Sequence, residues 1–293
     1  ADADREQVME LWAGLGYYRR ARFLHESAEM VVRDFGGRLP DTFDELQELK
    51  GVGPYTAGAI ASIAFGRAVP VVDGNVERVL SRLEAIGGAP KSTENQKVYW
   101  ALAEQLVDPE RPGDFNQAMM ELGATLCTPS APSCMLCPVR PHCVGFRGGN
   151  PEDYPDVAKR TRQRPMEVAT CIVWRSVGDE REFLTLQRPS DGLLGGLWEF
   201  PTVEVDSVEQ SDEAVEAFLA EIGVEADSPR SLGSLVHHFS HIRMTIGAQS
   251  RQTQENAVVD SLERDHRWVD ESSLSQLPMS AAMRKVLALF EQE

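Results

Sequence analysis

The sequence has no apolar run of 18 or more residues, so it offers no candidate for a membrane-spanning helix. Its first residues, ADADREQVMEL, lack the basic and then apolar pattern of a secretory signal. Cysteine is scarce, and four of the five cysteines fall between residues 127 and 143, unlike the cysteines of a secreted disulfide scaffold. These absences predict a protein that stays inside the cell and does not bind a membrane.

Basic residues are also few. The chain has 29 Lys and Arg against 46 Asp and Glu, and its net charge of -17 argues at first against nucleic acid, because duplex binding depends on neutralised phosphates. The charge is uneven: residues 1–150 carry 15 basic and 20 acidic residues (net -5), and residues 151–293 carry 14 and 26 (net -12). Residues 203–228 hold nine acidic residues and no basic one, which indicates a solvated face turned away from any polyanion.

The length of 293 residues favours two domains, and the periodicity of the apolar residues changes along the chain. Helical spacing dominates the first part, where we expect helices near 5–14, 20–35, 42–48, 55–65, 74–86, 94–107 and 114–126. The segment RGGNPEDYPDVAKRTRQRP is typical of a linker. Two short strands, ATCIVWRS and EFLTLQRP, and helices near 211–222 and 279–291 follow. The sequence thus predicts a multi-domain fold: an all-α domain over 1–146, a linker over 147–165 and an α+β domain over 166–293.

A glycine-rich corner stands at residues 49–56, which read LKGVGPYT. Gly51 and Gly53 on either side of Val52 allow a sharp turn whose N–H groups face outward, and at the start of a helix such donors suit a phosphate. The other interpretation is an ordinary corner between two helices with glycine caps. From these residues alone both stay open.

Asp73 lies in VPVVDGNV, where a short apolar run delivers it into a turn just before a helix. An aspartate there is commonly an N-cap that satisfies the first free amides of the helix. It can also serve as a carboxylate beside a developing cation, as when an N-glycosidic bond breaks and leaves positive charge on the sugar. The two roles can compete for one side chain.

Cys127, Cys134, Cys137 and Cys143 follow the spacing C-x6-C-x2-C-x5-C in a proline-rich segment. Such a compact set of thiolates can bind an iron-sulfur cluster or zinc. One close pair with two outlying cysteines favours the cluster, since common zinc modules have two close pairs; a redox disulfide within the close pair is disfavoured. Cys171 lies in an apolar run, and we expect a buried strand thiol.

The order of hairpin, aspartate and four cysteines resembles the helix-hairpin-helix superfamily of DNA glycosylases, and within it the family that removes adenine opposite 8-oxoguanine. The resemblance is close over residues 8–146, in LWAGLGYYRRAR, GVGPYTAGAIASIAFG, VVDGNVERVL and FNQAMMELGATLCTP. It implies that Asp73 stabilises an oxocarbenium-like sugar. It also implies that the four cysteines hold a 4Fe-4S cluster, which shapes a DNA-contacting loop and does no bond chemistry. We assign to DNA contacts Gly51, Val52, Gly53 and Asn75.

Tyr55 distinguishes members of this superfamily. Relatives of the endonuclease III type carry a lysine there, whose amine attacks the sugar and allows strand cleavage through a Schiff base. A phenol cannot form that imine, so we expect base removal without strong strand cleavage and a catalytic-site position for Tyr55 near the sugar. The alternative is a buried tyrosine that caps the hairpin.

Residues 166–293 resemble the Nudix-like recognition domain of the same glycosylases, most specifically in QRPSDGLLGGLWEFP. A Nudix hydrolase helix needs R-E-apolar-x-E-E-x-G to bind magnesium. When this pattern is aligned on Gly223, only one of its three glutamates is present, as Glu221, and Glu216 stands where the arginine should be. We therefore expect the domain to bind its ligand without the magnesium-dependent hydrolysis of a Nudix enzyme. HHFSH at 237–241 is by itself a loop that enters a strand. The resemblance assigns three of its residues to recognition of 8-oxoguanine: Phe239, Ser240 and His241.

The family also has an earlier segment with a glutamate general acid and a glutamine-rich wedge, and neither precedes Ala1. Adenine leaves well only when protonated, so we expect the chain as written to fold but to excise poorly or not at all. The alternatives are an endonuclease III-like lyase and a lesion-binding protein without catalysis. The expected partner is double-stranded DNA with 8-oxoguanine:adenine mispairs. We expect a monomer, in the nucleus of a eukaryote, with a further organelle as a second location, or in the cytoplasm of a bacterium.

Overall fold

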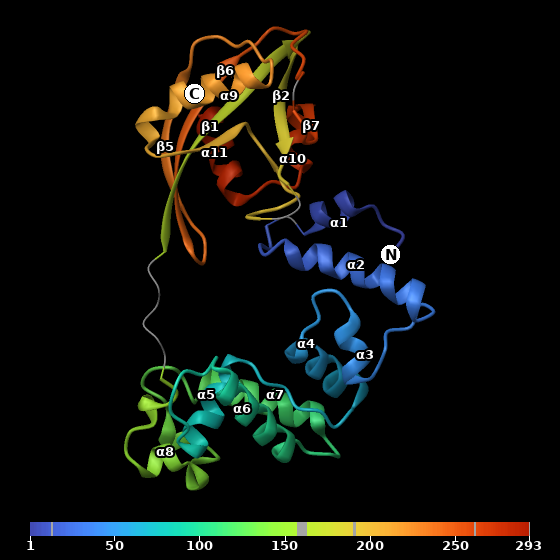
Figure 1. The fold of residues 1–293 in the computed structure, drawn as a ribbon, viewed down its shortest axis with the longest axis vertical. Coiled ribbons are helices and arrows are strands. Elements are labelled where there is room, and N and C mark those ends of the chain that lie inside the picture. Colours follow the sequence, from blue (N-terminus) through green and yellow to red (C-terminus); the bar gives the residue numbers. More distant parts are fainter. Residues whose placement is uncertain (13, 157–162, 190–191, 261, 293) are drawn as a thin grey trace. The chain divides into compact units, whose positions relative to one another are not determined.

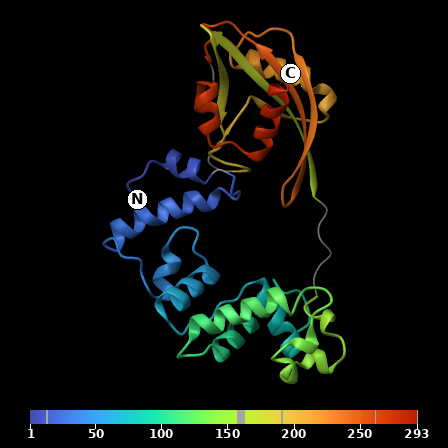
Figure 2. The same ribbon diagram turned by 180° about the vertical axis from the view of Figure 1, so that it is seen from behind.

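The computed structural model describes residues 1–12, 14–156, 163–189, 192–260 and 262–292. The middle of the predicted linker, 157–162, and the Ser-Asp pair at 190–191 of the Nudix-like stretch lie outside the described residues. Contacts between residues divide the chain into two compact units (Figures 1 and 2): unit 1 is Ala1 with Glu26–Arg160, and unit 2 is Asp2–His25 with Thr161–Glu293. Helices make up the described part of unit 1 and a sheet with helices dominates unit 2, which confirms the predicted fold class.

The helices expected between residues 5 and 126 lie within a few residues of their predicted ranges, whereas the short helices between residues 134 and 153 were not predicted, and the last of these lies inside the predicted linker. All these helices are α1 (Arg5–Leu11), α2 (Arg19–Asp34), α3 (Phe43–Glu48), α4 (Pro54–Ala59), the π-helical η1 (Ile60–Ala64), α5 (Gly74–Glu84), α6 (Thr93–Leu106), α7 (Pro112–Thr125), η2 (Cys134–Leu136), η3 (Arg140–His142), α8 (Val144–Arg147) and η4 (Pro151–Asp153). Side-chain oxygens accept from backbone N–H groups of the first turn at four of these starts, which fixes where the helices begin: Asp4, Thr42, Asp73 and Ser92.

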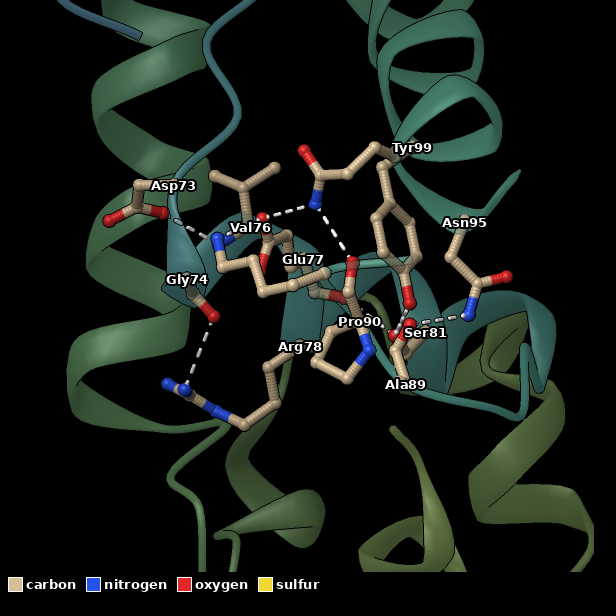
Figure 3. Close-up of polar contacts among 12 residues, drawn as sticks. Asp73, Gly74, Val76, Glu77, Arg78, Ser81, Ala89, Pro90, Asn95 and Tyr99 are labelled. Carbon is tan, nitrogen blue, oxygen red and sulfur yellow. Dashed lines mark hydrogen bonds and ion pairs between the residues drawn. The ribbon is translucent and has the colours of Figure 1, made fainter. Parts of the chain in front are cut away.

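Unit 1 is held together by two apolar clusters. One packs α3 against α4 and η1 through buried side chains such as Leu46, Leu49 and Ala57. The other packs α5 against α6 through Leu80 and Tyr99, both fully buried, together with their neighbours. The Tyr99 hydroxyl and Ser81 Oγ share a hydrogen bond of 2.7 Å in this cluster, so the one polar atom of the ring is satisfied (Figure 3).

Unit 2 contains one seven-stranded sheet with central order β3-β2-β1-β6-β5; β4 pairs with β1, and β7 pairs with β2. Its elements are β1 (Arg164–Val177), β2 (Glu180–Gln187), β3 (Trp198–Glu199), β4 (Thr202–Val205), η5 (Val208–Gln210), α9 (Ser211–Glu221), β5 (Arg230–His238), β6 (Ile242–Gln252), β7 (His266–Asp270), α10 (Glu271–Gln276) and α11 (Ala281–Glu291). The pairs are antiparallel except β1 with β6. No helix in the described part of the chain is both long and apolar enough to cross a membrane.

Alternating side chains of β1 bury both faces of this sheet. Val168 and Ile172 point into the cluster that α10 and α11 cover. Ala169, Cys171 and Val173 point into the cluster that α9 covers. The near-continuous apolar run of β1 therefore marks a central strand with helices on both faces, which is why the run ATCIVW shows little alternation.

Asp2–His25 belongs to unit 2 by its contacts, although the sequence places it with the first domain. Met9, Tyr18 and Ala21 form a buried cluster with Leu197, which lies just before β3. These side chains pack there because a short helix alone cannot cover its own apolar face. The N-terminal segment thereby becomes part of the unit that holds the predicted recognition loop.

Cys171 is fully buried, as predicted, and burial raises the pKa of its thiol to about 12. Since unfolding returns the pKa to its ordinary value of 9.0, the unfolded chain loses this proton first as the pH rises, and stability must fall. We expect unit 2 to lose about 1.4 kcal/mol between pH 7 and pH 10 through this group. Urea unfolding followed by tryptophan fluorescence tests this; Cys171→Ala should flatten the decline, and an unchanged slope would contradict it.

Candidate functional site

The predicted hairpin lies between α3 and α4. Gly51 has a φ of 74°, in the left-handed region that favours glycine, and Gly53 is the N-cap of α4. Both glycines are exposed, whereas Val52 is half-buried against the cluster of α3 and α4. The Lys50 carbonyl accepts a hydrogen bond from Ser27 Oγ of α2 (2.8 Å). The corner is thus fixed from behind and presents its glycine backbone to solvent.

The apolar run that leads to Asp73 lies in close contact with α4 and α7. Asn116 of α7 is buried and holds this run, because its Oδ1 accepts from Val71 N (3.2 Å) and its Nδ2 donates to the Val69 carbonyl (2.9 Å). A Cβ on Gly58 would lie 2.3 Å from the Pro70 carbonyl oxygen. Gly58 therefore permits a backbone approach that no other residue would allow.

Asp73 is the N-cap of α5 and is only half-buried (Figure 3). Its Oδ1 accepts from Val76 N (2.8 Å), and its Oδ2 accepts from Asn75 Nδ2 (3.0 Å). Asn75 Oδ1 in turn accepts from Arg78 Nη2 (2.9 Å), so the side-chain amide of Asn75 is engaged within the protein. Capping thus fixes the direction of the carboxylate and still leaves it open to solvent, which makes the two roles considered for Asp73 compatible.

Glu77 lies one turn further along α5 and points the other way, into the protein (Figure 3). Its side chain is 5% exposed and accepts at Oε1 from Lys91 Nζ (2.6 Å) and from Gln96 Nε2 (2.7 Å). Gln96 also donates to the Pro90 carbonyl (2.8 Å). These contacts join α5 to α6 and the loop before it, and so hold the helix that carries Asp73.

Tyr55 is 44% exposed, so the alternative of a buried tyrosine is wrong. Its hydroxyl lies 3.9 Å from Met120 Sδ of α7. Gly123, one turn further along α7, packs on Asn75, since a Cβ there would lie 2.6 Å from Asn75 Cβ. Residues three apart on a helix share a face, so Tyr55 and the Asp73 turn are brought to one side of α7.

The four cysteines of residues 127–143 line one cavity, whose wall also contains Arg82 and apolar side chains of α5, α7 and the loop. Burial raises the pKa of the Cys134 thiol, and the other three cysteines add to this effect. Cys143 is the N-cap of α8 and accepts at Sγ from Phe146 N (3.4 Å). The four cysteines therefore line the same cavity.

Arg82 ties this loop to α5 from within. It is 3% exposed, and its guanidinium donates to the carbonyls of Thr128 (2.7 Å), Pro129 (3.0 Å) and Tyr154 (3.0 Å) and to Cys127 Sγ (3.4 Å). A single buried cation thus contacts the first cysteine and satisfies three backbone acceptors.

Arg78 makes a second link between the loop and α5. Its Nε donates to the Cys127 carbonyl (2.7 Å), and its Nη2 donates to Gly123 O (2.6 Å) as well as to Asn75. Burial lowers the pKa of Arg78, while the charges of Cys127 and Asp73 oppose this effect. A continuous set of hydrogen bonds therefore runs from the Asp73 carboxylate through Asn75 and Arg78 to the first cysteine.

The four cysteines of this cavity give it a donor set made of sulfur alone. Among the described residues, no three His, Cys, Asp or Glu side chains are grouped as ligands of one metal ion. A zinc ion needs all its sulfurs about 2.3 Å from one point. A 4Fe-4S cluster takes one thiolate for each iron, and the four cysteines that line this cavity supply that number of sulfurs.

The predicted recognition loop of unit 2 is the turn between β5 and β6. Ser240 and His241 are exposed, and Phe239 is half-buried on the core, with its ring 4.6 Å from that of His237. Gln163 braces the turn, since its Oε1 contacts His238 Nδ1 (2.8 Å) and its Nε2 donates to the Phe239 carbonyl. Burial lowers the pKa of His237, so this ring favours the neutral form.

Sequence reasoning missed a tyrosine beside this loop. The Tyr17 hydroxyl and Ser240 Oγ share a hydrogen bond of 2.9 Å within unit 2. Tyr17 is 72% exposed and has a φ of 48°, a strained value for a residue other than glycine. The only signal in the sequence was the glycine-rich string GLGYY. Asn116, Gln163 and Arg82 were also missed, because nothing local predicts their distant partners.

Comparison with known families agrees with both halves of the structure. Residues 1–105 match the family described as "HhH-GPD superfamily base excision DNA repair protein", and residues 170–289 match the NUDIX domain. The matches overlap neither with each other nor with the cysteine loop.

Curated relatives match the chain along nearly its whole length. The adenine DNA glycosylase of Homo sapiens is 40% identical over 338 residues, which cover 99% of this chain and 62% of the human protein. The adenine DNA glycosylase of Arabidopsis thaliana is 43% identical over 314 residues, which cover 97% of this chain and 49% of the plant protein. The chain thus spans about half to two thirds of the length of these relatives.

The adenine DNA glycosylase of Schizosaccharomyces pombe is 36% identical over 318 residues, which cover 93% of this chain and 68% of the yeast protein. The chain is 36% identical to this relative over more than two thirds of its length, and it contains the HhH-GPD and NUDIX families in that order. This chain therefore belongs to the adenine DNA glycosylase family.

Proposed function

We propose that this protein is a monofunctional base excision repair glycosylase that removes adenine mispaired with 8-oxoguanine, with domains at 1–146 and 166–293 joined by a linker at 147–165. The observation that carries the proposal is the geometry of Asp73, a half-exposed carboxylate fixed by Val76 N and Asn75 at the start of α5. A fixed negative charge stabilises a cation most when it need not reorganise during the reaction.

In the proposed reaction, adenine is rotated out of the duplex and its bond to C1′ of the sugar breaks. The electron pair leaves with the base, which takes up a proton, and positive charge develops on the sugar. The Asp73 carboxylate stabilises this cation until a water oxygen bonds to C1′ and the water releases a proton, which balances the proton that the adenine takes up. Tyr55 lies near the sugar in this account, and its phenol forms no imine, so the strand is not cut through a Schiff base.

We propose that Cys127, Cys134, Cys137 and Cys143 hold a 4Fe-4S cluster. Their shared lining of one cavity supports this, as does the hydrogen bond that Arg82 gives to Cys127 Sγ. When bound, the cluster supplies a rigid, charge-neutralising cross-link of the loop. The chain itself transmits this rigidity to Asp73 through Arg78 and Asn75.

Lesion choice is assigned to the loop of Phe239, Ser240 and His241, with the Tyr17 hydroxyl beside it. DNA phosphates are proposed to meet the exposed backbone at Gly51, Val52 and Gly53. Asn75 takes part through its backbone, since its amide is already engaged. The proposed partner is duplex DNA with 8-oxoguanine:adenine mispairs. We propose that the protein binds it as a monomer. The proposed location is the nucleus of a eukaryote, with a further organelle as a second location, or the cytoplasm of a bacterium.

Single-turnover incubation with duplexes that contain 8-oxoguanine:adenine, guanine:adenine or 8-oxoguanine:cytosine tests the proposal. The expected result is slow release of adenine from the first duplex, slower release from the second and no base from the third, with strand breaks only after alkali; the release is slow because this chain carries no glutamate general acid before Ala1. A covalent adduct after borohydride treatment would instead indicate the lyase. Tight, lesion-selective binding without adenine release would leave a lesion-binding protein and contradict the enzyme.

A further inference from the structure

The first helix of the chain is attached to the sheet of unit 2 through one carboxylate. Glu6 of α1 accepts two hydrogen bonds from Arg267 of β7, from Nη1 to Oε1 (2.8 Å) and from Nη2 to Oε2 (3.0 Å). The indole N–H of Trp198 in β3 donates to the same Oε1 (3.1 Å). Arg267 also lies over the Trp198 ring, 4.4 Å from its centroid. One side chain of α1 therefore engages two strands at once.

This contact joins a partly exposed ion pair to a buried indole. Trp198 is fully buried, whereas the side chain of Glu6 is 29% exposed and that of Arg267 is 47% exposed. Two parallel N–H···O bonds between a guanidinium and a carboxylate are both strong and directional. Loss of Glu6 would also leave the N–H of a buried indole without its partner, which carries a desolvation cost. The pair therefore fixes an orientation as well as a position.

A second anchor follows further along the same segment, where Tyr18 and Ala21 pack with Leu197 in a buried cluster. The turn that carries Tyr17 lies between the two anchors. Tyr17 itself is exposed and strained, and its side chain hydrogen-bonds Ser240 of the recognition loop. A strained exposed residue keeps one conformation only when the structure around it is held. The anchors on either side supply that support.

We propose that Glu6 is a positioning residue for lesion recognition: through Arg267 and Trp198 it holds Tyr17 against Ser240. The base opposite adenine is then read by a surface made from both ends of the chain. The inference rests on the proposed function, in which Ser240 inspects 8-oxoguanine. Glu6 itself contacts no DNA in this account and acts only through Tyr17.

The test is Glu6→Gln in the full chain, because glutamine keeps the volume and an acceptor for Trp198 but removes the charge. Binding is measured to two duplexes that carry a non-cleavable 2′-fluoro adenosine opposite 8-oxoguanine or opposite guanine. We expect the preference for 8-oxoguanine to fall about fivefold, with little change in affinity for the guanine duplex or in Tm. A merely structural defect would weaken both affinities together.

A double-mutant cycle makes the assignment specific. Arg267→Gln should cause a similar loss, and the double variant E6Q/R267Q should lose no more than either single variant. Asp34→Asn removes an exposed pair with Arg33 in unit 1 and should change nothing. Retained preference in E6Q, or additive losses in the double variant, would overturn the inference. If the wild-type chain itself showed no preference for 8-oxoguanine, the proposed function would be wrong, and this result would be distinct from a failure of the inference about Glu6.

Discussion

Replacing Asp73 with asparagine should lower the single-turnover rate of adenine release by about 10²- to 10³-fold, because the carboxylate is the group that meets the developing sugar cation. The same change should weaken binding of a duplex that contains a cationic pyrrolidine in place of the sugar. Binding of a duplex with the neutral tetrahydrofuran analogue should be unaffected. The difference in affinity between the cationic and the neutral duplex measures the effect of the Asp73 charge. Neither analogue requires protonation of an adenine, so this step does not influence the result.

Asparagine is a suitable control for structure at this position. It caps helices about as well as aspartate, so its Oδ1 can still accept from Val76 N. The free energy of unfolding of unit 1 should therefore change by less than about 0.5 kcal/mol. If the variant bound the cationic and neutral duplexes in the same ratio as the wild type, Asp73 would be a cap and nothing more.

Replacing Arg82 with methionine should destabilise unit 1 by about 3 to 5 kcal/mol, the largest effect on stability that we expect. Methionine fills most of the volume but leaves the carbonyls of Thr128, Pro129 and Tyr154 without their donor. The loop should then loosen and lose iron. Urea unfolding and metal analysis of the same preparation would measure both consequences.

Two comparisons separate this effect from a general loss of charge. Arg111→Met removes an arginine that is 74% exposed and pairs with Asp114, and it should cost less than about 0.5 kcal/mol. In Arg82→Lys the positive charge is kept, but one ammonium group cannot donate to acceptors that lie in several directions. We therefore expect an intermediate loss of stability. If Arg82→Met were as stable as Arg111→Met, the proposed role of the buried guanidinium would be wrong.

Local patterns were sufficient for most of unit 1. Apolar spacing and the capping residues placed the helices, and Asp73 was correctly put in the turn just before α5. The spacing also indicated that the four cysteines lie near one another, and they line one cavity. The predicted helix at 55–65 is one exception in detail, since it continues as the π-helical η1 from Ile60.

What the sequence could not supply were contacts between residues far apart in the chain. Tyr17 meets Ser240 and Glu6 meets Arg267 across more than 200 residues. Strands β3, β4 and β7 were missed because strands of two to five residues carry too little alternation to detect. The longer β5 was also missed, because it contains Gly233 and buries few side chains. The placement of Asp2–His25 with unit 2 has the same origin, as Leu197 is the distant partner of its apolar face.

The central claim of this account is that α5 joins two features that the reaction needs together. Asp73 stands at its first turn, and Arg78 and Arg82 on later turns bind the cysteine loop. If the loop is built around a cluster, then removal of the cluster must disturb the carboxylate. If the loop binds no metal, or a single ion, then the contacts of Arg78 and Arg82 do not couple a cluster to Asp73.

Quantifying iron, acid-labile sulfide and zinc in the purified chain tests this most directly. The account predicts about four iron atoms and four sulfides per chain, both lost together when Cys143 is replaced by serine. One zinc ion per chain without sulfide, or a protein that folds fully with no metal at all, would contradict it.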